Sequence, residues 1–416
     1  MDGVEEKTLK CIRCGFCLDA CPTFRLTGQE TLSPRGRIYL VRSWHEGVIP
    51  LNEEVVEALD TCLGCRACET ACPSGVEYGA ILEMARAEIE ANHKRPRLQG
   101  MARKQLVDLL ANPKRLALSL KAGRLLPSAR QGRLPGFAAK LLSGTTDTPV
   151  RLPRSHGKAV PLPERSPAVG EKRYTVGMLT GCVMQVLFGD INSATVRVLQ
   201  KNGCEVLAPS RLGCCGALHL HVGLLEEARR YAQAFLDALS PFLEEMDAFV
   251  VNSAGCGSTL KEYAELLHHD PAYAERAHRF AEKVRDVSEW LMEIGLSTRP
   301  NPLSLTVTYH DACHLAHAQR IRSQPRALLQ TIPELKLVEL EEADTCCGSA
   351  GVYNITQPEM AKRLLDRKIE NIRATGASYV ATGNPGCLAW IEQGVEDAKL
   401  AIKVCHPVEL LDRALS

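Results

Sequence analysis

Residues 11–22 read CIRCGFCLDACP, and residues 62–73 read CLGCRACETACP. Both stretches follow the pattern C-x2-C-x2-C-x3-C-P. The two-residue spacing lets three thiolates converge from one tight loop onto three corners of a cubane, whose fourth corner must be filled from elsewhere in the chain. The two stretches together therefore predict two [4Fe-4S] clusters.

The fourth cysteine of each run has a particular role in two-cluster ferredoxins, where it ligates the cluster of the other run. We therefore expect two ligand sets: Cys11, Cys14, Cys17 and Cys72 (the first cubane site), and Cys62, Cys65, Cys68 and Cys21 (the second cubane site). Zinc and disulfides are the alternatives. Zinc sites usually pair two C-x2-C hooks, without a four-cysteine run ending in proline, and a chain that is not exported keeps its thiols reduced.

The segments around these runs predict helices. Ser33 can cap a helix over residues 33–46, with Pro34 at its first position, and a second helix is expected over residues 77–93. The 40 residues between the two runs, with a helix among them, favour an α-helical ferredoxin over the compact β-rich kind. We assign residues 1–93 to this ferredoxin domain, which holds eight of the 18 cysteines.

Length and composition limit the remaining choices. A chain of 416 residues exceeds what one hydrophobic core spans, so two or three units are expected. With 45% hydrophobic residues and a formal net charge of +1, neither a disordered chain nor a general polyanion binder fits. No run of about 18 apolar residues appears, and the N-terminus lacks the regions of a secretory signal. We expect a soluble, cytoplasmic, globular protein.

Residues 94–172 form a basic connector in this interpretation. Between residues 94 and 173 there are 18 lysines and arginines against four acidic residues, together with nine prolines. The first part could form basic amphipathic helices, and residues 144–172 have the composition of an extended linker. A solvated linker and a docking surface for an acidic partner or anionic lipid both remain open. Nucleic acid is not expected as a partner, because the charge lies in a proline-rich segment with few aromatic residues.

The remaining chain is a duplication. Cys182 and Cys313 are 131 residues apart, Cys214 and Cys346 are 132 apart, and Cys256 and Cys387 are 131 apart. Each half predicts a strand before its first cysteine, a strand before its Cys-Cys-Gly triplet and a strand before its last cysteine. We expect two doubly wound α/β lobes, residues 173–300 and 301–416, with the cysteines at the carboxyl ends of strands, where such sheets bind ligands.

Each lobe offers four thiols for a metal. They are Cys182, Cys214, Cys215 and Cys256 (the first CCG site), and Cys313, Cys346, Cys347 and Cys387 (the second CCG site). Adjacent cysteines strain when they chelate one small ion, but they can bind neighbouring irons of a cluster. Glycines beside them let the backbone approach an inorganic core. An iron-sulfur cluster and a four-thiolate zinc ion both remain open for each site.

Other cysteines and several histidines have less certain roles. Cys204 and Cys405 lie outside the motifs and are expected to be buried structural thiols. The histidines beside the CCG cysteines could supply a further ligand or move protons, although a hydrogen bond to a cluster sulfide or a polar surface is the simpler expectation. They are His219, His221, His310, His314 and His317.

The duplicated half resembles the cysteine-rich CCG modules of the heterodisulfide reductase group, which hold iron-sulfur clusters. The fullest form of that module ends in C-x2-C, but here Ser253 and Asn384 stand at the upstream position. Across nearly its whole length the chain resembles the iron-sulfur subunit of glycolate oxidase (glycolate dehydrogenase). The segments that carry this resemblance are GFCLDACPTFRLTGQE, SPRGRIYL, CETACPSGV, GCCGALHLH, SAGCGSTLKEY and CCGSAGVYN. The SPRGRIYL segment favours this family over the related anaerobic glycerol-3-phosphate dehydrogenase subunit.

The resemblance implies an electron-transfer subunit of an oxidoreductase complex. Its partners would be FAD-containing subunits that oxidise a 2-hydroxy acid such as glycolate, and a quinone or other acceptor, with peripheral contact at the inner face of the membrane. No G-x-G-x-x-G after a predicted strand, no P-loop and no nucleophile elbow occurs, so neither flavin nor a hydride-abstracting site is expected in this chain. The alternatives are a thiol/disulfide reductase subunit of the heterodisulfide reductase kind, and a zinc-stabilised scaffold.

Overall fold

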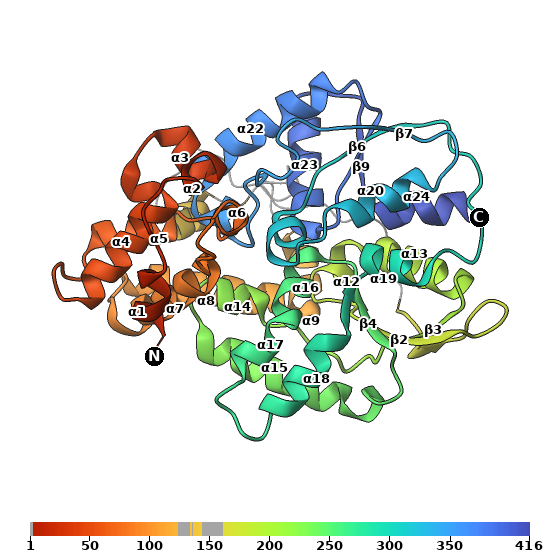
Figure 1. The fold of residues 1–416 in the computed structure, drawn as a ribbon, viewed down its shortest axis with the longest axis horizontal. Coiled ribbons are helices and arrows are strands. Elements are labelled where there is room, and N and C mark those ends of the chain that lie inside the picture. The colour runs from red at the N-terminus through yellow and green to blue at the C-terminus, as the bar shows by residue number, and fades with distance from the viewer. Residues whose placement is uncertain (1–2, 124–133, 135, 144–160) are drawn as a thin grey trace.

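A computed structural model describes residues 3–123, 134, 136–143 and 161–416 of the chain. An α-helical N-terminal domain lies at one side of two α/β lobes (Figure 1). This agrees with the predicted class, a multidomain α plus α/β protein. Within the described residues, no helix is long and apolar enough to cross a membrane.

The N-terminal domain consists of short helices around the two cysteine runs. Its elements are α1 (Val4–Leu9), α2 (Cys17–Ala20), α3 (Pro22–Thr27), η1 (Glu30–Leu32), α4 (Pro34–His45), α5 (Glu53–Asp60), α6 (Ala67–Thr70) and α7 (Tyr78–Asn92). The predicted start of α4 is confirmed, because the Ser33 hydroxyl accepts a hydrogen bond from the Gly36 amide at 3.0 Å and Pro34 needs no amide partner. The helix predicted over residues 77–93 is α7.

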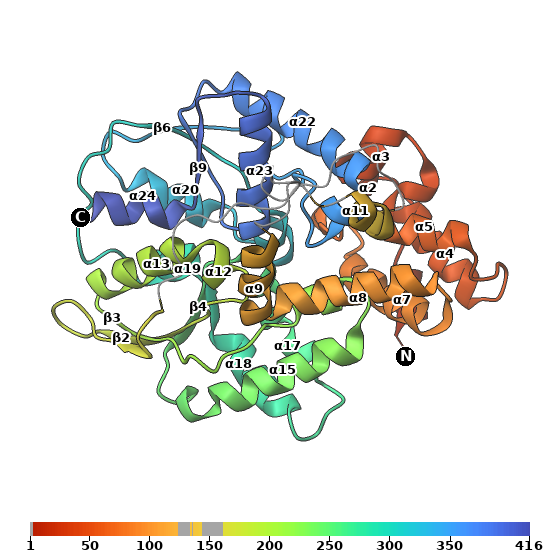
Figure 2. The ribbon, with the colours of Figure 1, turned by 180° about the vertical axis from the view of Figure 1, so that it is seen from behind.

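The first part of the basic connector is helical where the structure describes it. Its helices are α8 (Arg97–Ala111), α9 (Pro113–Gly123) and α11 (Gly136–Ser143). Figure 2 shows α8 and α9 crossing the back of the molecule from α7 towards α12. Val107 of α8 is fully buried against Val222 and Val352, so α8 joins both lobes. The basic amphipathic helices predicted for this region are thus confirmed.

The structure differs in part from the extended linker that we expect over residues 144–172. Residues 144–160 lie outside the described residues, but Arg165–Ser166 form strand β1, which pairs antiparallel with Val206 and Leu207. The linker prediction missed this strand because two residues are too short to show an alternating pattern. The sheet of the first lobe therefore begins within the predicted connector.

The first lobe is a five-stranded sheet covered by helices. Its elements after β1 are β2 (Tyr174–Met178), α12 (Met184–Leu187), α13 (Gly189–Lys201), β3 (Cys204–Leu207), α14 (Ala217–His221), α15 (Leu225–Leu239), η2 (Ser240–Phe242), β4 (Ala248–Val251), α16 (Ala254–Lys261), α17 (Tyr263–Leu266), α18 (Ala274–Lys283), β5 (Val284–Asp286) and α19 (Val287–Ile294). The strand order is β1-β3-β2-β4-β5, and all pairs except the one with β1 are parallel.

The second lobe repeats this topology without the edge strand. Its elements are β6 (Thr306–Tyr309), the π-helical turn η3 (His314–Ala318), α20 (Ser323–Gln330), β7 (Lys336–Val338), α21 (Tyr353–Thr356), α22 (Pro358–Ala374), β8 (Tyr379–Ala381), α23 (Pro385–Asp397), β9 (Lys403–Cys405) and α24 (Pro407–Ala414). The strand order is β7-β6-β8-β9. Val176 pairs with Ala248, and Val307 pairs with Tyr379, so the registers of the two sheets match at the predicted spacing.

One apolar core joins the two lobes. Helix α13 packs on α24, and α19 packs on α20, so the last helix of each lobe covers the first long helix of the other. Val198 of α13 and Leu411 of α24 are fully buried in this shared core. At the sheet ends, the Ala254 amide donates to the Gly383 carbonyl at 3.0 Å. These contacts hold the carboxyl ends of both sheets, and with them the cysteines, in a fixed arrangement.

Candidate metal centres

The first cubane site lies at the surface of the N-terminal domain. One pocket is lined by all four expected cysteines, Cys11, Cys14, Cys17 and Cys72, and also by Cys68. Cys14 is exposed, whereas Cys11, Cys17 and Cys72 are partly buried. Burial raises the pKa of Cys17 to about 11. The structure thus brings together three thiols of the first run and the last thiol of the second run.

The two cysteine runs share one loop shape. Arg13 and Gly64 occupy equivalent positions and both have a left-handed backbone, with φ of 59° and 62°. Gly15 and Arg66 form a second such pair, with φ of 90° and 62°. Left-handed residues curl a loop tightly and turn its amide groups inward, which suits an anionic core with sulfur acceptors. Arginine in this conformation costs free energy that the surrounding fold must offset.

The second cubane site is buried. Cys21, Cys62, Cys65 and Cys68 are each less than one-tenth exposed. The charge of Cys21 raises the pKa of Cys65 and of Cys68, although burial is the larger cause for both. Burial also opposes ionisation of Cys62, but Arg37, Arg86 and the Tyr78 hydroxyl outweigh it and lower the pKa of this thiol. The site therefore combines convergent thiols with nearby positive charge.

Arg37 is the main buried cation beside this site. Its side chain is 1% exposed, and its guanidinium donates to the Ala58 carbonyl at 2.6 Å and to the Thr23 hydroxyl at 3.2 Å. One of its nitrogens lies 4.0 Å from the Cys21 sulfur. A fixed positive charge at this depth favours anionic thiolates and an anionic cluster.

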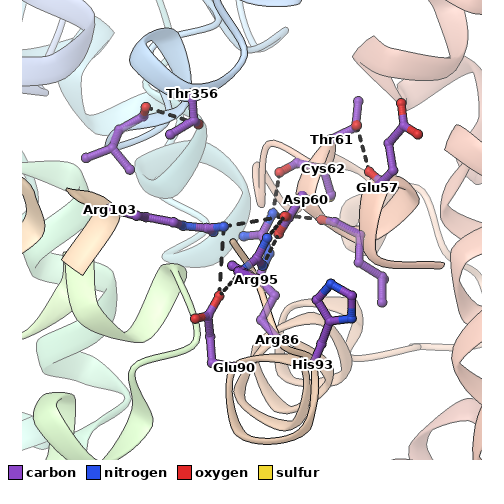
Figure 3. A network of polar contacts seen from close by, with 12 residues as sticks. Glu57, Asp60, Thr61, Cys62, Arg86, Glu90, His93, Arg95, Arg103 and Thr356 are labelled. Carbon is purple, nitrogen blue, oxygen red and sulfur yellow. Dashed lines mark hydrogen bonds and ion pairs between the residues drawn. The ribbon is translucent and has the colours of Figure 1, made fainter. Parts of the chain in front are cut away.

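A polar network holds the loop that begins at Cys62. The Arg86 guanidinium donates to the Cys62 carbonyl at 2.7 Å and to the Leu59 carbonyl at 2.9 Å. Asp60 accepts from Arg95 at 2.6 Å and from Arg103 at 3.4 Å (Figure 3). The network ties the end of α5 to α7 and α8, and so fixes the start of the second cysteine run.

The first CCG site gathers its four cysteines at the carboxyl end of its sheet. Strands β2 and β4 mark the point where the strand order reverses, and Cys182 and Cys256 follow them. The sulfur atoms of Cys182 and Cys214 are 3.7 Å apart. The Gly216 amide donates to the Cys214 sulfur at 3.4 Å, with φ of 80° at Gly216. Cys214 and Cys215 are buried, as an inorganic core requires.

The second CCG site repeats this arrangement. Cys346, Cys347 and Cys387 are buried, and the Gly348 amide lies 3.5 Å from the Cys346 sulfur. Among the residues that the structure describes, only one group of three or more candidate ligands has all its ligand atoms within 4.8 Å of one another. That group is His310, Cys347 and Cys387. The site thus has an imidazole in addition to its thiols.

Ser253 and Asn384, which stand where the fullest CCG module has a cysteine, contact the last cysteine of each site. The Asn384 amide donates to the Cys387 sulfur at 3.5 Å. A hydrogen bond from Ser253 helps to lower the pKa of Cys256, after the larger contribution of Cys215. Both residues therefore act as hydrogen-bond donors to a thiolate at this position.

The second cubane site and the CCG sites face a common cavity of about 800 Å³. Its wall includes Cys62 and every cysteine of both CCG sites. Three contacts join the second cysteine run to the second lobe: His314 Nε2 donates to the Gly64 carbonyl at 3.1 Å, the Thr70 hydroxyl lies 2.9 Å from His317 Nδ1, and the Tyr353 hydroxyl donates to the Thr61 carbonyl at 3.0 Å. The sequence carries no signal for these contacts, which join residues 247, 250 and 292 positions apart.

A group of ionisable side chains lines another part of this cavity. Burial raises the pKa of Glu83 and that of Glu262 to about 7, and lowers the pKa of His221 to about 4. His221 Nδ1 is 3.1 Å from a Glu83 oxygen, and Arg66 forms an ion pair with Glu262. Sequence reasoning considered His221 but missed the two glutamates, because they belong to ordinary helical segments.

The other candidates have structural partners. Cys204 and Cys405 are buried in strands β3 and β9 and do not line the cavity that the CCG cysteines share. His219 Nε2 is 3.0 Å from Asp108. His317 Nε2 donates to the Asp344 carbonyl at 3.0 Å. These contacts account for His219 and His317 without a metal.

Comparison with known proteins gives matches over the same regions. Residues 7–76 match the family described as a 4Fe-4S dicluster domain, and residues 176–261 and 307–392 each match the cysteine-rich domain family. These matches cover both cysteine runs and both CCG sites. Together with the convergent thiols, they show that the chain binds iron-sulfur clusters and consists of a dicluster domain and two CCG domains.

Several relatives are similar over much of the chain. The probable glycolate oxidase iron-sulfur subunit of Bacillus subtilis is 38% identical over 98% of this chain and 94% of its own length. The glycolate oxidase iron-sulfur subunit of Escherichia coli is 32% identical over 97% of this chain and 93% of its own length. A subunit of the fumarate reductase (CoM/CoB) of Methanothermobacter marburgensis is 34% identical over 58% of this chain and 46% of its own length.

Proposed function

The chain belongs to the family of glycolate oxidase iron-sulfur subunits, and we propose that it is the electron-transfer subunit of a flavin-dependent 2-hydroxy-acid (glycolate) dehydrogenase. FAD-containing partner subunits oxidise the hydroxy acid, and this chain carries the electrons onward to a quinone or another acceptor. Bound clusters supply one-electron redox chemistry. The protein's own residues determine the positions of the clusters, the extent to which water is excluded around them and the charges nearby.

The proposed ligands are the cysteines of the four sites. The two cubane sites belong to the domain of residues 1–93, and the connector of residues 94–172 links it to the lobes of residues 173–300 and 301–416. Convergence of Cys11, Cys14, Cys17 and Cys72 around one pocket supports the first cubane site. The buried thiols beside Arg37 support the second cubane site. The short distance between sulfur atoms and the backbone amides that face sulfur support clusters in the CCG sites.

One observation carries the proposed function. The cysteine loop of the second cubane site packs directly on the second CCG site. Burial raises the pKa of Cys65, and the negative charge of Cys313 in the second CCG site raises it further. The thiols therefore extend from exposed Cys14 through the buried second cubane site to the two lobes. Such a continuous series of redox sites is what electron transfer through a protein needs.

The donor is proposed to dock at the first cubane site. Two large apolar side chains in the first cysteine run are exposed there, Ile12 by 69% and Phe16 by 68%, and Tyr39 is half exposed. Arg13 stacks over the Tyr39 ring at 4.8 Å. Exposed apolar side chains around a redox centre suit a flavin-carrying partner subunit that covers them.

The acceptor side is proposed to lie along the connector. Leu98 and Met101 of α8 and Leu118 of α9 are exposed among basic side chains. Helices with this composition bind the interface of an anionic membrane, which would hold a quinone near the protein. We therefore place the subunit in the cytoplasm, at the inner face of the membrane.

Reconstitution tests the proposal. The chain is purified anaerobically with its FAD-containing partner subunits, and reduction of a quinone analogue is followed after glycolate is added. Cys65→Ser should abolish quinone reduction while glycolate still reduces the flavin. Cys204→Ser, which changes a buried thiol outside the four sites, should retain quinone reduction. Unchanged quinone reduction by the Cys65 variant would contradict the proposed route.

A further inference from the structure

The two CCG sites can be compared position by position. The Leu179 amide donates to the Val250 carbonyl at 3.2 Å, and the His310 amide donates to the Ala381 carbonyl at 2.9 Å. In each lobe the donor residue directly follows its strand, and the strand pairs of the two lobes have matching registers. His310 is therefore the equivalent of Leu179, and the duplication has replaced an apolar side chain with an imidazole.

The surroundings of these two residues differ. Leu179 is 2% exposed and packs in an apolar core together with Cys215 and Phe235. His310 is fully buried, and neither of its ring nitrogens makes a hydrogen bond of normal length and angle among the described residues, although the Ala343 backbone makes a weaker contact with the ring. At least one nitrogen of this buried imidazole therefore lacks a partner, which costs free energy, and in native proteins such a group normally has one.

The nearest candidates for that partner belong to the second CCG site. A ring nitrogen of His310 and the sulfur atoms of Cys347 and Cys387 all lie within 4.8 Å of one another. Imidazole and thiolate are both ligands of iron and zinc. The position on the end of a strand also fixes the direction of the ring.

A second replacement accompanies the first. The glycines that follow the two Cys-Cys pairs, Gly216 and Gly348, are equivalent, and their neighbours show which helix residues correspond. Gly216 faces Ala228 and Tyr231 of α15, and Gly348 faces Ala361 and Leu364 of α22. Both pairs of neighbours are 133 residues apart, and the same spacing makes Lys368 the equivalent of Phe235.

Lys368 brings positive charge to the second CCG site. Its side chain is 2% exposed, and its ammonium group donates to the Glu342 carbonyl. Burial lowers the pKa of Lys368, and the nearby Cys347 and Cys346 act in the opposite direction, in favour of its charged form. The second CCG site thus has an imidazole and an ammonium group where the first has a leucine and a phenylalanine.

We propose that His310 is a nitrogen ligand of the metal at the second CCG site, beside Cys347 and Cys387, whereas the first CCG site is ligated through thiolates without a histidine at that position. This inference rests on the CCG ligand sets proposed above. A neutral imidazole ligand adds no negative charge to an iron-sulfur centre and gives a higher reduction potential than a thiolate at the same position, and a nearby cation acts in the same direction. The two sites of the duplication would therefore differ in potential, with the second as the better electron acceptor.

The test is spectroscopic and does not need glycolate turnover. The full chain is produced with 15N-labelled and with unlabelled histidine, its clusters are reduced, and pulsed EPR is recorded. A strong nitrogen coupling that changes with the label and disappears in His310→Cys supports the inference. His317→Gln is the matched control, because both ring nitrogens of His317 have protein partners. That variant should keep the coupling.

A redox titration supplies a second readout. In His310→Cys, with a thiolate in place of the imidazole, the potential of the second CCG site should fall by at least about 59 mV, a tenfold change in a one-electron equilibrium. If the metal is zinc, zinc-edge absorption should show one imidazole beside thiolates. Metal at this site with thiolate ligands only would overturn the inference and leave the electron route intact. No metal at either CCG site would overturn both the ligand sets and the inference.

Discussion

His314 Nε2 donates a hydrogen bond of 3.1 Å to the carbonyl of Gly64. Gly64 lies between Cys62 and Cys65 of the second cubane site, and His314 directly follows Cys313 of the second CCG site. The bond is therefore a direct link from a side chain of one proposed cluster site to the backbone of the other. Burial lowers the pKa of His314 to about 3, so the ring is neutral and its proton is available for this bond.

The first prediction concerns this link. His314→Leu should keep iron at both sites but slow electron transfer from the second cubane site to the second CCG site, because the loop is no longer held against the lobe. Leaving the Gly64 carbonyl without its donor should also cost about 1–3 kcal/mol of stability. Rapid-freeze EPR measures the transfer. His278→Leu, an exposed change on α18, is the control, and equal rates in the two variants would contradict the prediction.

The second prediction concerns Arg37. Arg37→Met should lower the reduction potential of the second cubane site, because a buried positive charge beside Cys21 is lost. It should also destabilise the domain by roughly 1–3 kcal/mol, because the Ala58 carbonyl loses its donor; the Thr23 hydroxyl keeps its hydrogen bond to the Leu32 carbonyl. Arg37→Lys should retain more of the potential. An EPR-monitored redox titration measures both variants, and identical potentials in Arg37→Met and wild type would refute the electrostatic role.

The third prediction concerns Gly36 in α4. A Cβ atom at this position would lie 1.9 Å from the Glu30 carbonyl oxygen, so the turn before the helix must move. Gly36→Ala should lose at least about 1–3 kcal/mol and reduce the iron content of the N-terminal domain. Gly100→Ala in α8, where the nearest atom is 3.8 Å away, should instead gain about 0.5–1 kcal/mol. Thermal unfolding distinguishes the two; equal midpoints would show that the packing argument is wrong.

The fourth prediction concerns the pH dependence of stability. Burial raises the pKa of Glu83 to about 7, so this carboxyl binds more protons in the folded protein than in the unfolded chain between about pH 4.5 and 7. Its own contribution to stability should fall as the pH rises through this range. Glu83→Gln should remove that loss, and its gain over wild type in thermal midpoint should be larger at about pH 8 than at about pH 5.

Glu342 provides the contrast for this measurement. Hydrogen bonds from Arg367 and Arg25 lower its pKa to about 2, so its contribution to stability is complete above the unfolded value of about 4.5 and is lost only in stronger acid. Glu342→Gln should therefore lower the thermal midpoint by a similar amount at about pH 5 and about pH 8. If Glu83→Gln changes the thermal midpoint by the same amount at both pH values, this carboxyl is not protonated in the folded protein.

The sequence predicted the local features well because their causes are local. The start of α4 depends on Ser33 and Pro34, and the shape of each cysteine loop depends on a spacing of two residues. The duplicated lobes were equally visible, since three cysteine landmarks share one period and each strand precedes its cysteine. The edge strand of Arg165 and Ser166 was missed, because a pairing of two residues leaves no pattern.

By itself, the sequence determined where the candidate ligands cluster and that one module is duplicated, because ligand type and spacing are properties of a continuous chain. Only the tertiary structure decided which sites are neighbours and how they differ. The contact of Gly64 with His314 and the burial of His310 beside Cys347 and Cys387 arise from segments that are distant along the chain. Desolvation and charge depend on every atom that packs around a group, and that environment exists only after the lobes and the N-terminal domain have assembled.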